Sequence, residues 1–494
     1  MNAGIEYLFR HALLRDAAYQ LHLPGDRARL HALAFRVLEG LAGGRAPELS
    51  RDNLVDGRFP GHPADLLAEE LAEHARLAGS AGTSGSDGSD STREFDAAHR
   101  LYVRRSAVMM ERRHRLGEAL HRWKALSRIS EEPEQGVLLF RAGCCAMRSA
   151  RRSDAEQLLE QALLLHRRFG HTRLEVMTLQ NLGVLRRDSG RPELAQETLE
   201  SALEISISAG NQEWESQVLR DLGAQFVVTG RLLDARRCFE KGLSIAERMG
   251  DRRDQARTLN NYAILLKREC RFAEARRAFE KAIDLHRETG GTRDLGVALG
   301  GLANVLGEQR KFEAAVLLLE QAVAIHREVG NRECEGADLA NLALWRRKSS
   351  SFDEARPLFD EALQILRDVG NLRGEGIVLG QLAQELAGQG RFQDASELLD
   401  RSMDLLRRVG DRRSGGVTVC QFALGLLRLG RESDARRRWR EGVEVLGNTA
   451  ADAELAELAA RMKETCGSLG LQRFEAPQAW MNGDTTGLVA PERR

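Results

Sequence analysis

The chain has 494 residues, among them 73 basic and 73 acidic side chains, so its formal net charge at pH 7 is zero. This balance provides no overall field that would attract nucleic acid or an anionic membrane, and no apolar run is long enough to span a bilayer. Nine prolines and 30% charged residues favour a helix-rich protein. Seven scattered cysteines without a C-x-x-C pair argue against a disulfide framework or a zinc ribbon and favour the cytoplasm.

The first predicted element is a helical segment over residues 1–78, which differs in sequence from the rest of the chain. Its characteristic residues occur in a fixed order: residues 9–16 (FRHALLRD), Tyr19, Arg27, Leu30 and His31. This set resembles the region between the ATPase module and the repeat array of bacterial STAND-type signalling ATPases. The resemblance implies that a signalling ATPase or kinase is a partner. The residues by themselves allow a simpler interpretation, in which Phe9, Leu13 and Tyr19 are core residues of small helices.

Residues 79–93 are predicted to be a flexible Gly/Ser linker, because GSAGTSGSDGSDS at 79–91 has low complexity. Residues 94–133 follow as a degenerate first repeat, in which Ala107 and Ala119 are twelve residues apart. The same offset recurs throughout the array that follows.

An internal repeat of 40 residues dominates residues 134–446. Alanine recurs at positions 155, 195, 235, 275, 315, 355, 395 and 435, and glycine recurs at 170, 210, 250, 290, 330, 370 and 410. A small residue also occupies the position twelve before and the position seven after each of these alanines. A single copy cannot bury its apolar stripe alone, so the copies are expected to stack on one another as a solenoid.

Each copy has the pattern of two helices joined by short turns, as residues 251–290 illustrate. Asp251 is placed to cap a first helix, the chain turns at Cys270-Arg271, and Gly290 ends a second helix in the left-handed conformation. Apolar residues of the second helix recur at spacings of three and four, which indicates one buried stripe. Small residues are expected where the two antiparallel helices approach most closely, and in this copy they are Ala263, Ala275 and Ala282.

This spacing of small and large residues resembles the tetratricopeptide repeat. The residues that fit the family pattern in one copy are Leu182, Gly183, Ala195, Leu199 and Ala202. The 40-residue, proline-free form is similar to the subclass found in kinesin light chains and bacterial peptide-sensing regulators. The resemblance implies an all-α fold: a right-handed α-α superhelical solenoid of about eight to nine helical hairpins, eight of them within residues 134–446. A coiled coil is the alternative, but the glycine every 40 residues and the break within each copy argue against it.

After the array, residues 447–470 are predicted to form a capping helix that covers the last hairpin. Its apolar residues fall on one side of the helix, and they are Leu455, Leu458, Ala459 and Met462. Residues 471–494 carry Gly, Pro and polar residues without periodicity, so they are predicted to be a mobile tail.

The predicted binding surface is the concave face, which the first helix of each pair lines in tetratricopeptide solenoids. Short amides recur along this face of the first helices and can pair with both donors and acceptors of an extended peptide. Basic residues form bands suited to an acidic or C-terminal carboxylate ligand. For any single residue, the alternative is a solvated side chain. The candidate partner-binding residues are Gln180, Asn181, Arg187, Arg220, Asn260, Asn261, Lys267, Arg268, Asn304, Asn341, Arg347, Lys348 and Gln384.

No residue pattern predicts catalysis, a metal site or a cofactor. His166, His286 and His326 fall at one repeat position and are predicted to be surface residues, because none belongs to an H-E-x-x-H motif. Cys144 and Cys145 are predicted to be buried thiols rather than nucleophiles. The sequence has no G-x-x-x-x-G-K-[ST] loop, H-R-D run or G-x-S-x-G elbow, so neither a phosphate-binding loop nor an enzyme is expected.

The sequence therefore favours a non-catalytic scaffold or sensor arm of bacterial signalling that binds a peptide or protein segment in its groove. The alternative is the regulatory C-terminal part of a STAND ATPase, protein kinase or cyclase system whose catalytic part is on another chain. A third hypothesis, a peptide-pheromone receptor, uses the same groove. No cofactor, nucleic acid or membrane partner is expected, and the predicted localisation is cytoplasmic.

Overall fold

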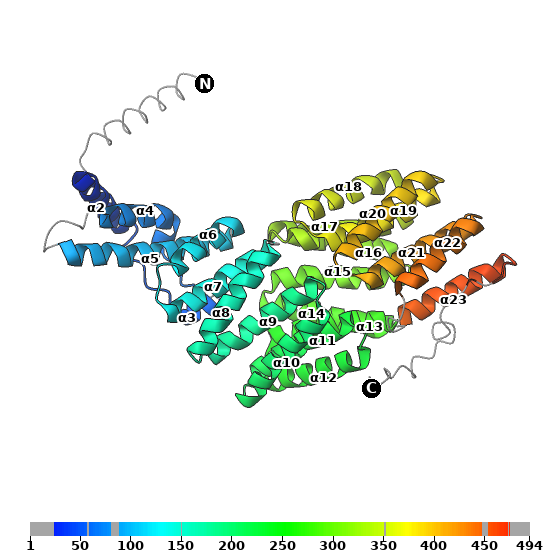
Figure 1. Cartoon of the computed structure of the whole chain (residues 1–494), viewed down its shortest axis with the longest axis horizontal. Helices are drawn as coiled ribbons and strands as arrows, with labels where there is room; N and C mark the ends of the chain where they lie inside the picture. Colours follow the sequence, from blue (N-terminus) through cyan, green and yellow to red (C-terminus); the bar gives the residue numbers. More distant parts are fainter. Residues whose placement is uncertain are drawn as a thin grey trace, which may run out of the picture. The chain divides into compact units, whose positions relative to one another are not determined.

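The computed structural model describes residues 24–56, 59–80, 88–149, 151–349, 352–446, 453–472 and 474. Within these ranges all regular secondary structure is helical, so the predicted all-α class is confirmed (Figure 1). The chain divides into two compact units, Met1–Thr178 and Leu179–Arg494. No helix of the described ranges is both long and apolar enough to cross a membrane.

The first unit begins with helices that precede the regular array. These are α2 (Pro24–Leu41), α3 (Arg51–Asp56), the 3-10 helix η1 (Pro63–Leu67), α4 (Ala68–Gly79), α5 (Gly88–Arg112) and α6 (Leu116–Ser127). Helix α5 contacts α6, and α6 contacts α7 (Glu132–Arg148), so the residues predicted to be a degenerate repeat form a helical pair next to α7. Because α5 begins at Gly88, the end of the predicted linker is helical, while residues 81–87 lie outside the described residues.

The residues that resemble the STAND junction are only partly described. Residues 9–16 and Tyr19 lie outside the described ranges. Arg27, Leu30 and His31 lie on α2. The proposed junction therefore stays a prediction.

From α7 onward, each repeat contributes a first and a second helix. The first helices after α7 are α9 (Thr172–Asp188), α11 (Gln212–Val228), α13 (Arg252–Arg268), α15 (Thr292–Glu308), α17 (Arg332–Ser349), α19 (Leu372–Gly388) and α21 (Arg412–Arg428). The second helices are α8 (Arg152–Arg168), α10 (Pro192–Ser208), α12 (Leu232–Met249), α14 (Phe272–Thr289), α16 (Phe312–Glu328), α18 (Phe352–Asp368), α20 (Phe392–Arg408) and α22 (Glu432–Leu446). Within the described ranges, the order and lengths of these helices agree with the hairpins that the 40-residue period predicts.

The first helices form the inner side of the array in the second unit. Each contacts the first helix of the next repeat: α11 contacts α13, and the series continues through α15, α17 and α19 to α21. Among the described residues, the backbones of successive second helices show no comparable approach. A face whose helices lie closer together is the concave one, so the inner face belongs to the first helices, as predicted.

The repeat at 251–290 shows why the sequence folds in this way. Asp251 accepts hydrogen bonds from the backbone N–H groups of Arg253 and Asp254, which satisfies donors that a helix start leaves free. Cys270 has φ +57° at the turn, and Gly290 has φ +68° after the second helix. The predicted small residues of the helix–helix contact are all fully buried: Ala263, Ala275 and Ala282.

The predicted surface position of three histidines is wrong, because His166, His286 and His326 are all buried. Each lies in the last turn of a second helix, and the rings of His166 and His326 pack onto the first helix of the same repeat. A Cβ added at Gly136 would lie 2.9 Å from the His166 ring, and one added at Gly296 would lie 2.7 Å from the His326 ring. A glycine on the first helix therefore makes room for the His166 ring and for the His326 ring in the core.

The C-terminal end of the array is covered by α23 (Ala453–Ser468), which contacts α21. Leu458, Ala459 and Met462 are buried as predicted, while the Leu455 side chain lies outside the described residues. The predicted mobile tail is wrong at its start, because Phe474 is buried in the C-terminal core and the Arg436 guanidinium lies 4.3 Å from its ring centroid. Residues 475–494 are outside the described ranges.

Candidate functional site

A polar hollow of about 320 Å³ lies on the inner face of the second unit. Three consecutive first helices, α11, α13 and α15, contribute to it, together with the last turn of the second helix α14. The residues that line the hollow are Arg220, Arg257, Asn260, Asn261, His286, Asp294 and Val297. Three of these, Arg220, Asn260 and Asn261, are predicted partner-binding residues, so the fold brings part of the predicted set together.

The charged groups of the hollow are neutralised by partners on the same helix or in the next repeat. Arg220 forms ion pairs with Asp254 and, at 3.2 Å, with Asp221. Burial lowers the pKa of the Arg220 guanidinium, but the charges of Asp221 and Asp254 outweigh burial and raise it above its ordinary value. Arg257 donates to Asp294 through a 2.8 Å contact between Nε and Oδ2. The ionic groups therefore shape the hollow without leaving a free charge in it.

Two side chains of the hollow each have a buried polar atom without a hydrogen bond in the described chain. Asn260 is only 9% exposed, and its Oδ1 is buried without a hydrogen bond within the described chain. His286 is 2% exposed, and its Nε2 is likewise buried and unpartnered. Burial lowers the pKa of the His286 imidazole, so the ring is neutral at pH 7. Since most buried polar atoms in proteins are hydrogen-bonded, this pair of atoms calls for an explanation.

The groove continues beyond the hollow along α13. Asn261 and Lys267 are half-buried and make no side-chain hydrogen bond or ion pair with the described residues. Ile264 lies between them on the same helix and is exposed, as is Val228 on the preceding first helix α11. This part of the inner face therefore offers an amide, an ammonium group and apolar surface side by side.

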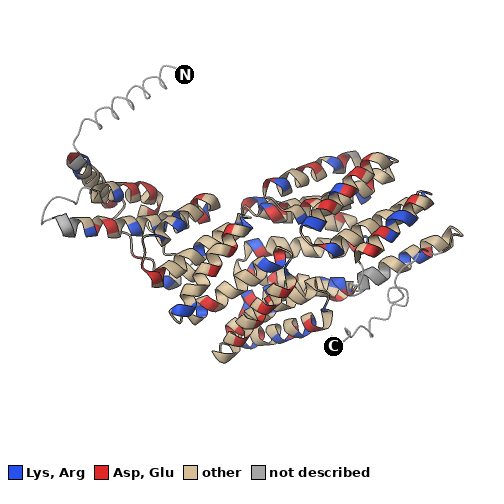
Figure 2. Cartoon of the chain, in the orientation of Figure 1, with Lys and Arg blue, Asp and Glu red and all other residues tan. Residues whose placement is uncertain are grey.

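The other predicted partner-binding residues are engaged within the chain. Asn181 is half-buried and also has a partner in the chain. The remaining contacts join Gln180 to Asp221, Arg187 to Asp188, Arg268 to the Val227 carbonyl, Asn304 to Trp345, Asn341 to Asp338, Arg347 and Lys348 to Glu385, and Gln384 to Gln421. Figure 2 shows the corresponding mixture of basic and acidic residues along the helices. The predicted basic bands are thus largely paired with acids or carbonyls.

Four residues of the hollow are missing from the predicted set: Arg257, His286, Asp294 and Val297. One signal for Arg257 and Asp294 exists in the sequence, since the acid follows the arginine by 37 residues, close to one repeat. Similar spacings join Arg373 on α19 to Asp411, the cap of α21, and Arg347 on α17 to Glu385 on α19. His286 is preceded 30 residues earlier by the small residue Ala256, which is the pattern of a buried ring.

The family of the chain follows from its repeats. The sequence model of the tetratricopeptide repeat matches residues 134–208, 175–248, 214–288, 254–328 and 335–408, which together make up more than half of the chain. The chain belongs to the tetratricopeptide-repeat (TPR) family. A search of curated proteins gives no significant match.

Several solved structures are similar to this TPR chain at low sequence identity. The Rap conjugation gene regulator of plasmid pLS20, in complex with the Phr* peptide, has 16% identity and a TM-score of 0.49, covering 75% of this chain and 99% of that chain. The apo quorum sensor NprR from B. thuringiensis has 16% identity and a TM-score of 0.46, covering 72% and 97%. Aspartyl phosphate phosphatase F from Bacillus subtilis has 12% identity and a TM-score of 0.47, covering 69% and 91%.

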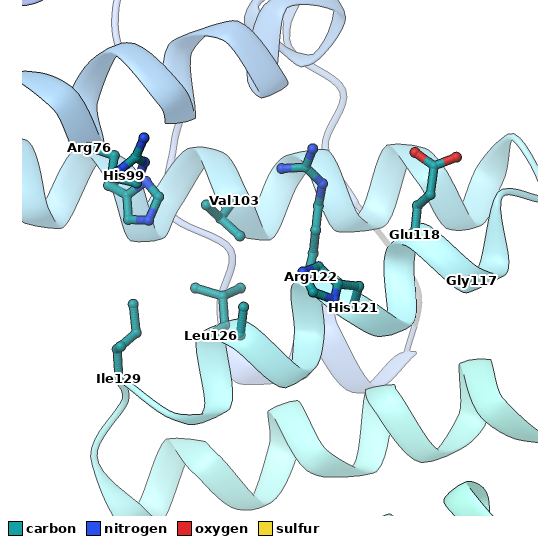
Figure 3. A pocket seen from close by; sticks show the side chains of 10 residues that line it. Arg76, His99, Val103, Gly117, Glu118, His121, Arg122, Leu126 and Ile129 are labelled. Atoms are coloured by element: carbon teal, nitrogen blue, oxygen red, sulfur yellow. The ribbon is translucent and has the colours of Figure 1, made fainter.

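A second hollow, of about 580 Å³, lies in the first unit, before the matched TPR residues. Figure 3 shows Arg76 and His99 at one end and Arg122 beside His121 further along, with Leu126 below Val103 between them. Arg76 pairs with Glu73, and Arg122 pairs with Glu69. None of the side chains that line it has a buried polar atom without a hydrogen bond in the described chain. The observation that singles out the TPR hollow is therefore absent here.

The thiols and metal-binding residue types of the described chain form no further site. Cys145 is buried, Cys144 is half-buried, and burial raises the pKa of the Cys144 thiol to about 11. A raised pKa disfavours the thiolate that nucleophilic chemistry needs. Within the described ranges, no three His, Cys, Asp or Glu side chains converge as a metal site requires.

Proposed function

We propose that the chain binds a peptide or protein segment on the inner face of the TPR array, centred on α11, α13 and α15. The observation that carries this proposal is the set of available groups on α13, where Asn261 and Lys267 have no partner in the described chain. An extended peptide leaves its backbone N–H and C=O groups unpaired, and a side-chain amide can donate to one and accept from the other.

Exposed apolar side chains support the same proposal. Ile264 is 38% exposed and Val228 is 51% exposed, and both lie on first helices beside the polar groups. Burial of apolar surface supplies most of the free energy of protein association, whereas polar groups fix orientation and register. A groove with both features suits a segment that carries apolar side chains on an extended backbone.

Fewer basic groups are available to a ligand than the sequence predicts, and this limits the negative charge that the ligand can carry. Of the basic residues predicted to form bands, Lys267 is the one with no partner in the described chain, because the others bind Asp188, Glu385 or the Val227 carbonyl. We therefore propose a ligand with one carboxylate near Lys267, not a strongly acidic one.

A peptide selection tests the proposal. Peptides of about ten residues, selected from a random display library against the full chain, are measured against wild type and the double variant Asn261→Ala/Lys267→Ala by calorimetry. Loss of one neutral and one charged hydrogen bond should weaken binding on the order of 30-fold or more. Circular dichroism should show unchanged helix content.

Lys281→Ala serves as the matched control, since Lys281 is an exposed residue of the second helix α14, outside the groove. It removes the same charge and should leave peptide affinity unchanged. A library that yields no binder, or binders whose affinity the double variant does not alter, contradicts groove binding at α13.

A further inference from the structure

We propose that two turns of the second unit form a clasp that closes the inner face of the array. The turns are residues 189–191, between α9 and α10, and residues 409–411, between α20 and α21. The closed face admits a single extended chain, which enters by a free end or after the clasp opens. This inference rests on the proposed function and adds the shape of the segment that the groove takes and the control of its entry.

The two turns of the clasp meet at backbone atoms. A Cβ added at Gly190 would overlap the carbonyl oxygen of Val409, and one added at Gly410 would lie 3.7 Å from the carbonyl oxygen of Gly190. Gly190 also has φ +74°, a conformation that strains any residue with a Cβ. Glycine at position 190 therefore allows the two backbones to approach this closely.

The contact is not a general property of the repeat. Gly390 is equivalent to Gly190, and Gly370 is equivalent to Gly410, but a Cβ added at either would meet no atom of the described chain within 4 Å. Gly190 and Gly410 are 220 residues apart, which is five and a half repeats of 40 residues. The contact is therefore made by the curvature of the array and not by neighbouring repeats.

The places of the two turns in their repeats show what the contact does to the array. Antiparallel hairpins put every turn from a first to a second helix on one edge of a solenoid, and every turn from a second to a first helix on the other edge. Residues 189–191 belong to one edge and residues 409–411 to the other. The array therefore coils about once and then touches its own opposite edge, with the five first helices from α11 to α19 inside the closed coil.

The length of one coil limits what fits inside it. Successive first helices are in contact, and five and a half of them at a spacing of about 10 Å form a ring about 18 Å across between opposite helix axes. Side chains extend about 5 Å from each helix axis, which leaves a passage of about 8 Å. An extended chain, which lies about 4.8 Å from its neighbours in a sheet, fits this passage, whereas a helix about 10 Å wide does not.

Photocrosslinking tests the clasp without any ligand. The change Ser189→p-benzoylphenylalanine in the full chain should give an intramolecular crosslink to the peptide that contains Val409 and Gly410, identified by mass spectrometry of the monomer. Adding Gly190→Ala should remove most of this crosslink, because the new Cβ forces the Val409 carbonyl away. A wild-type monomer without this crosslink overturns the inference.

Gly390→Ala is the matched control for Gly190→Ala. Gly390 has φ +80°, close to the +74° of Gly190, so alanine is strained in the same way at both positions. Only the Cβ at position 190 meets another turn, so Gly390→Ala should keep the crosslink. An equal loss of the crosslink in both variants would trace it to strain within a turn and would overturn the clasp.

Binding kinetics test the control of entry. A peptide selected against the full chain is measured with free ends and also with a small folded domain fused to each end. The folded domains cannot pass through the passage, so wild type should bind the flanked peptide more slowly than the free one. Gly190→Ala should raise both the association and the dissociation rate constant of the flanked peptide about 3- to 10-fold and leave its Kd nearly unchanged, because an open clasp helps entry and exit alike.

The free peptide in both variants, and the flanked peptide in Gly390→Ala, should keep their wild-type rates. Equal wild-type rates for the free and flanked peptides, or flanked-peptide rates that Gly190→Ala leaves unchanged, overturn the controlled entry. A selected peptide that is helical when bound overturns the extended shape. Each of these results leaves the proposed function intact, whereas a library without binders contradicts the proposed function and leaves the crosslink to decide whether the clasp exists.

Discussion

Two regions of the inner face carry similar residues but differ in whether those residues are available. On α13, Asn261 and Lys267 have no partner in the described chain, whereas the equivalent Asn341 and Arg347 on α17 are bound by neighbours. The partners are Asp338, on α17 itself, and Glu385, one repeat further along.

The cause lies in two other positions of the repeat. The equivalent of Asp338 in α13 is Thr258, and the equivalent of Glu385 in α15 is Val305. Val305 has no polar side-chain group, and the Thr258 hydroxyl is buried without a hydrogen bond in the described chain, so neither holds Asn261 or Lys267. Whether a groove residue can bind a ligand is therefore decided by its neighbour one turn or one repeat away, and not by its own identity.

The largest expected effect comes from removing an acid that pairs a buried arginine. In Asp254→Ala, the Arg220 side chain, only 13% exposed, loses its partner and Ser216 loses an acceptor. We expect a loss of about 3 kcal/mol in the free energy of unfolding, below the upper range for a buried pair because Asp221 remains. Denaturation by urea measures the change, and hydrogen exchange of amides in α11 and α13 should show where it occurs.

Glu385→Ala is the corresponding change in the other region. The Arg347 and Lys348 side chains are 32% and 45% exposed, more than that of Arg220, so water can replace the carboxylate. The loss in the free energy of unfolding should therefore be about 1 kcal/mol or less. Equal losses for Asp254→Ala and Glu385→Ala would contradict the proposed difference between the regions.

A pH effect about as large as that of Asp254→Ala is expected from His166, a buried histidine of the first unit whose two ring nitrogens make no hydrogen bond in the described chain. Burial lowers its pKa to about 4, with smaller effects from His171 and Arg51. The unfolded imidazole titrates near pH 6.5, so between pH 6.5 and 4 the unfolded chain binds more protons. The free energy of unfolding should therefore fall by about 3 kcal/mol in total as pH decreases through this window. Above pH 6.5 the contribution of His166 to stability is fully present.

His166→Ser tests this sign, because serine occupies the equivalent position 206 and does not titrate. The variant should lose the part of the pH dependence between pH 6.5 and 4 that His166 supplies, whatever its stability at pH 7. A wild-type pH profile that the substitution leaves unchanged would show that His166 does not titrate differently in the folded and unfolded states.

The smallest expected effect concerns the turns between first and second helices. Cys270 and Arg310 have φ +57° and +62°, at positions where Gly190, Gly230 and Gly390 stand in other repeats. A residue with a Cβ is strained in this conformation by about 1 kcal/mol. Cys270→Gly and Arg310→Gly should each raise the free energy of unfolding by about 0.5–1 kcal/mol, partly offset by the greater freedom of glycine in the unfolded chain. Gly390→Ala, measured in the same denaturation series, should have the opposite sign.

Much of the fold could be predicted because the repeat tests each inference many times. The caps, turns and small contact residues of the 251–290 copy follow from local chemistry, and the structure confirms Asp251, Cys270 and Gly290 in these roles. The burial of the three histidines could not be predicted in the same way. Their burial depends on a small residue on the facing helix, such as Gly136 or Gly296, about 30 positions earlier.

The candidate site was predictable only in part. Arg220, Asn260 and Asn261 follow from the face of the first helices, but His286 lies on the second helix α14 and enters the hollow only through packing. The start of the tail shows the same limit, since nothing in its composition indicates that Phe474 packs against Arg436.

The sequence by itself determined the 40-residue period, the paired helices and the face that the first helices turn inward, because these depend on residues close together in the chain. Only the tertiary structure decided which polar groups on that face are satisfied. The partner of Arg220 or Arg347 stands one repeat away, so side-chain pairing depends on how neighbouring repeats are stacked. Hydrogen bonds and ion pairs act over about 3 Å, and only the packed array fixes distances that small.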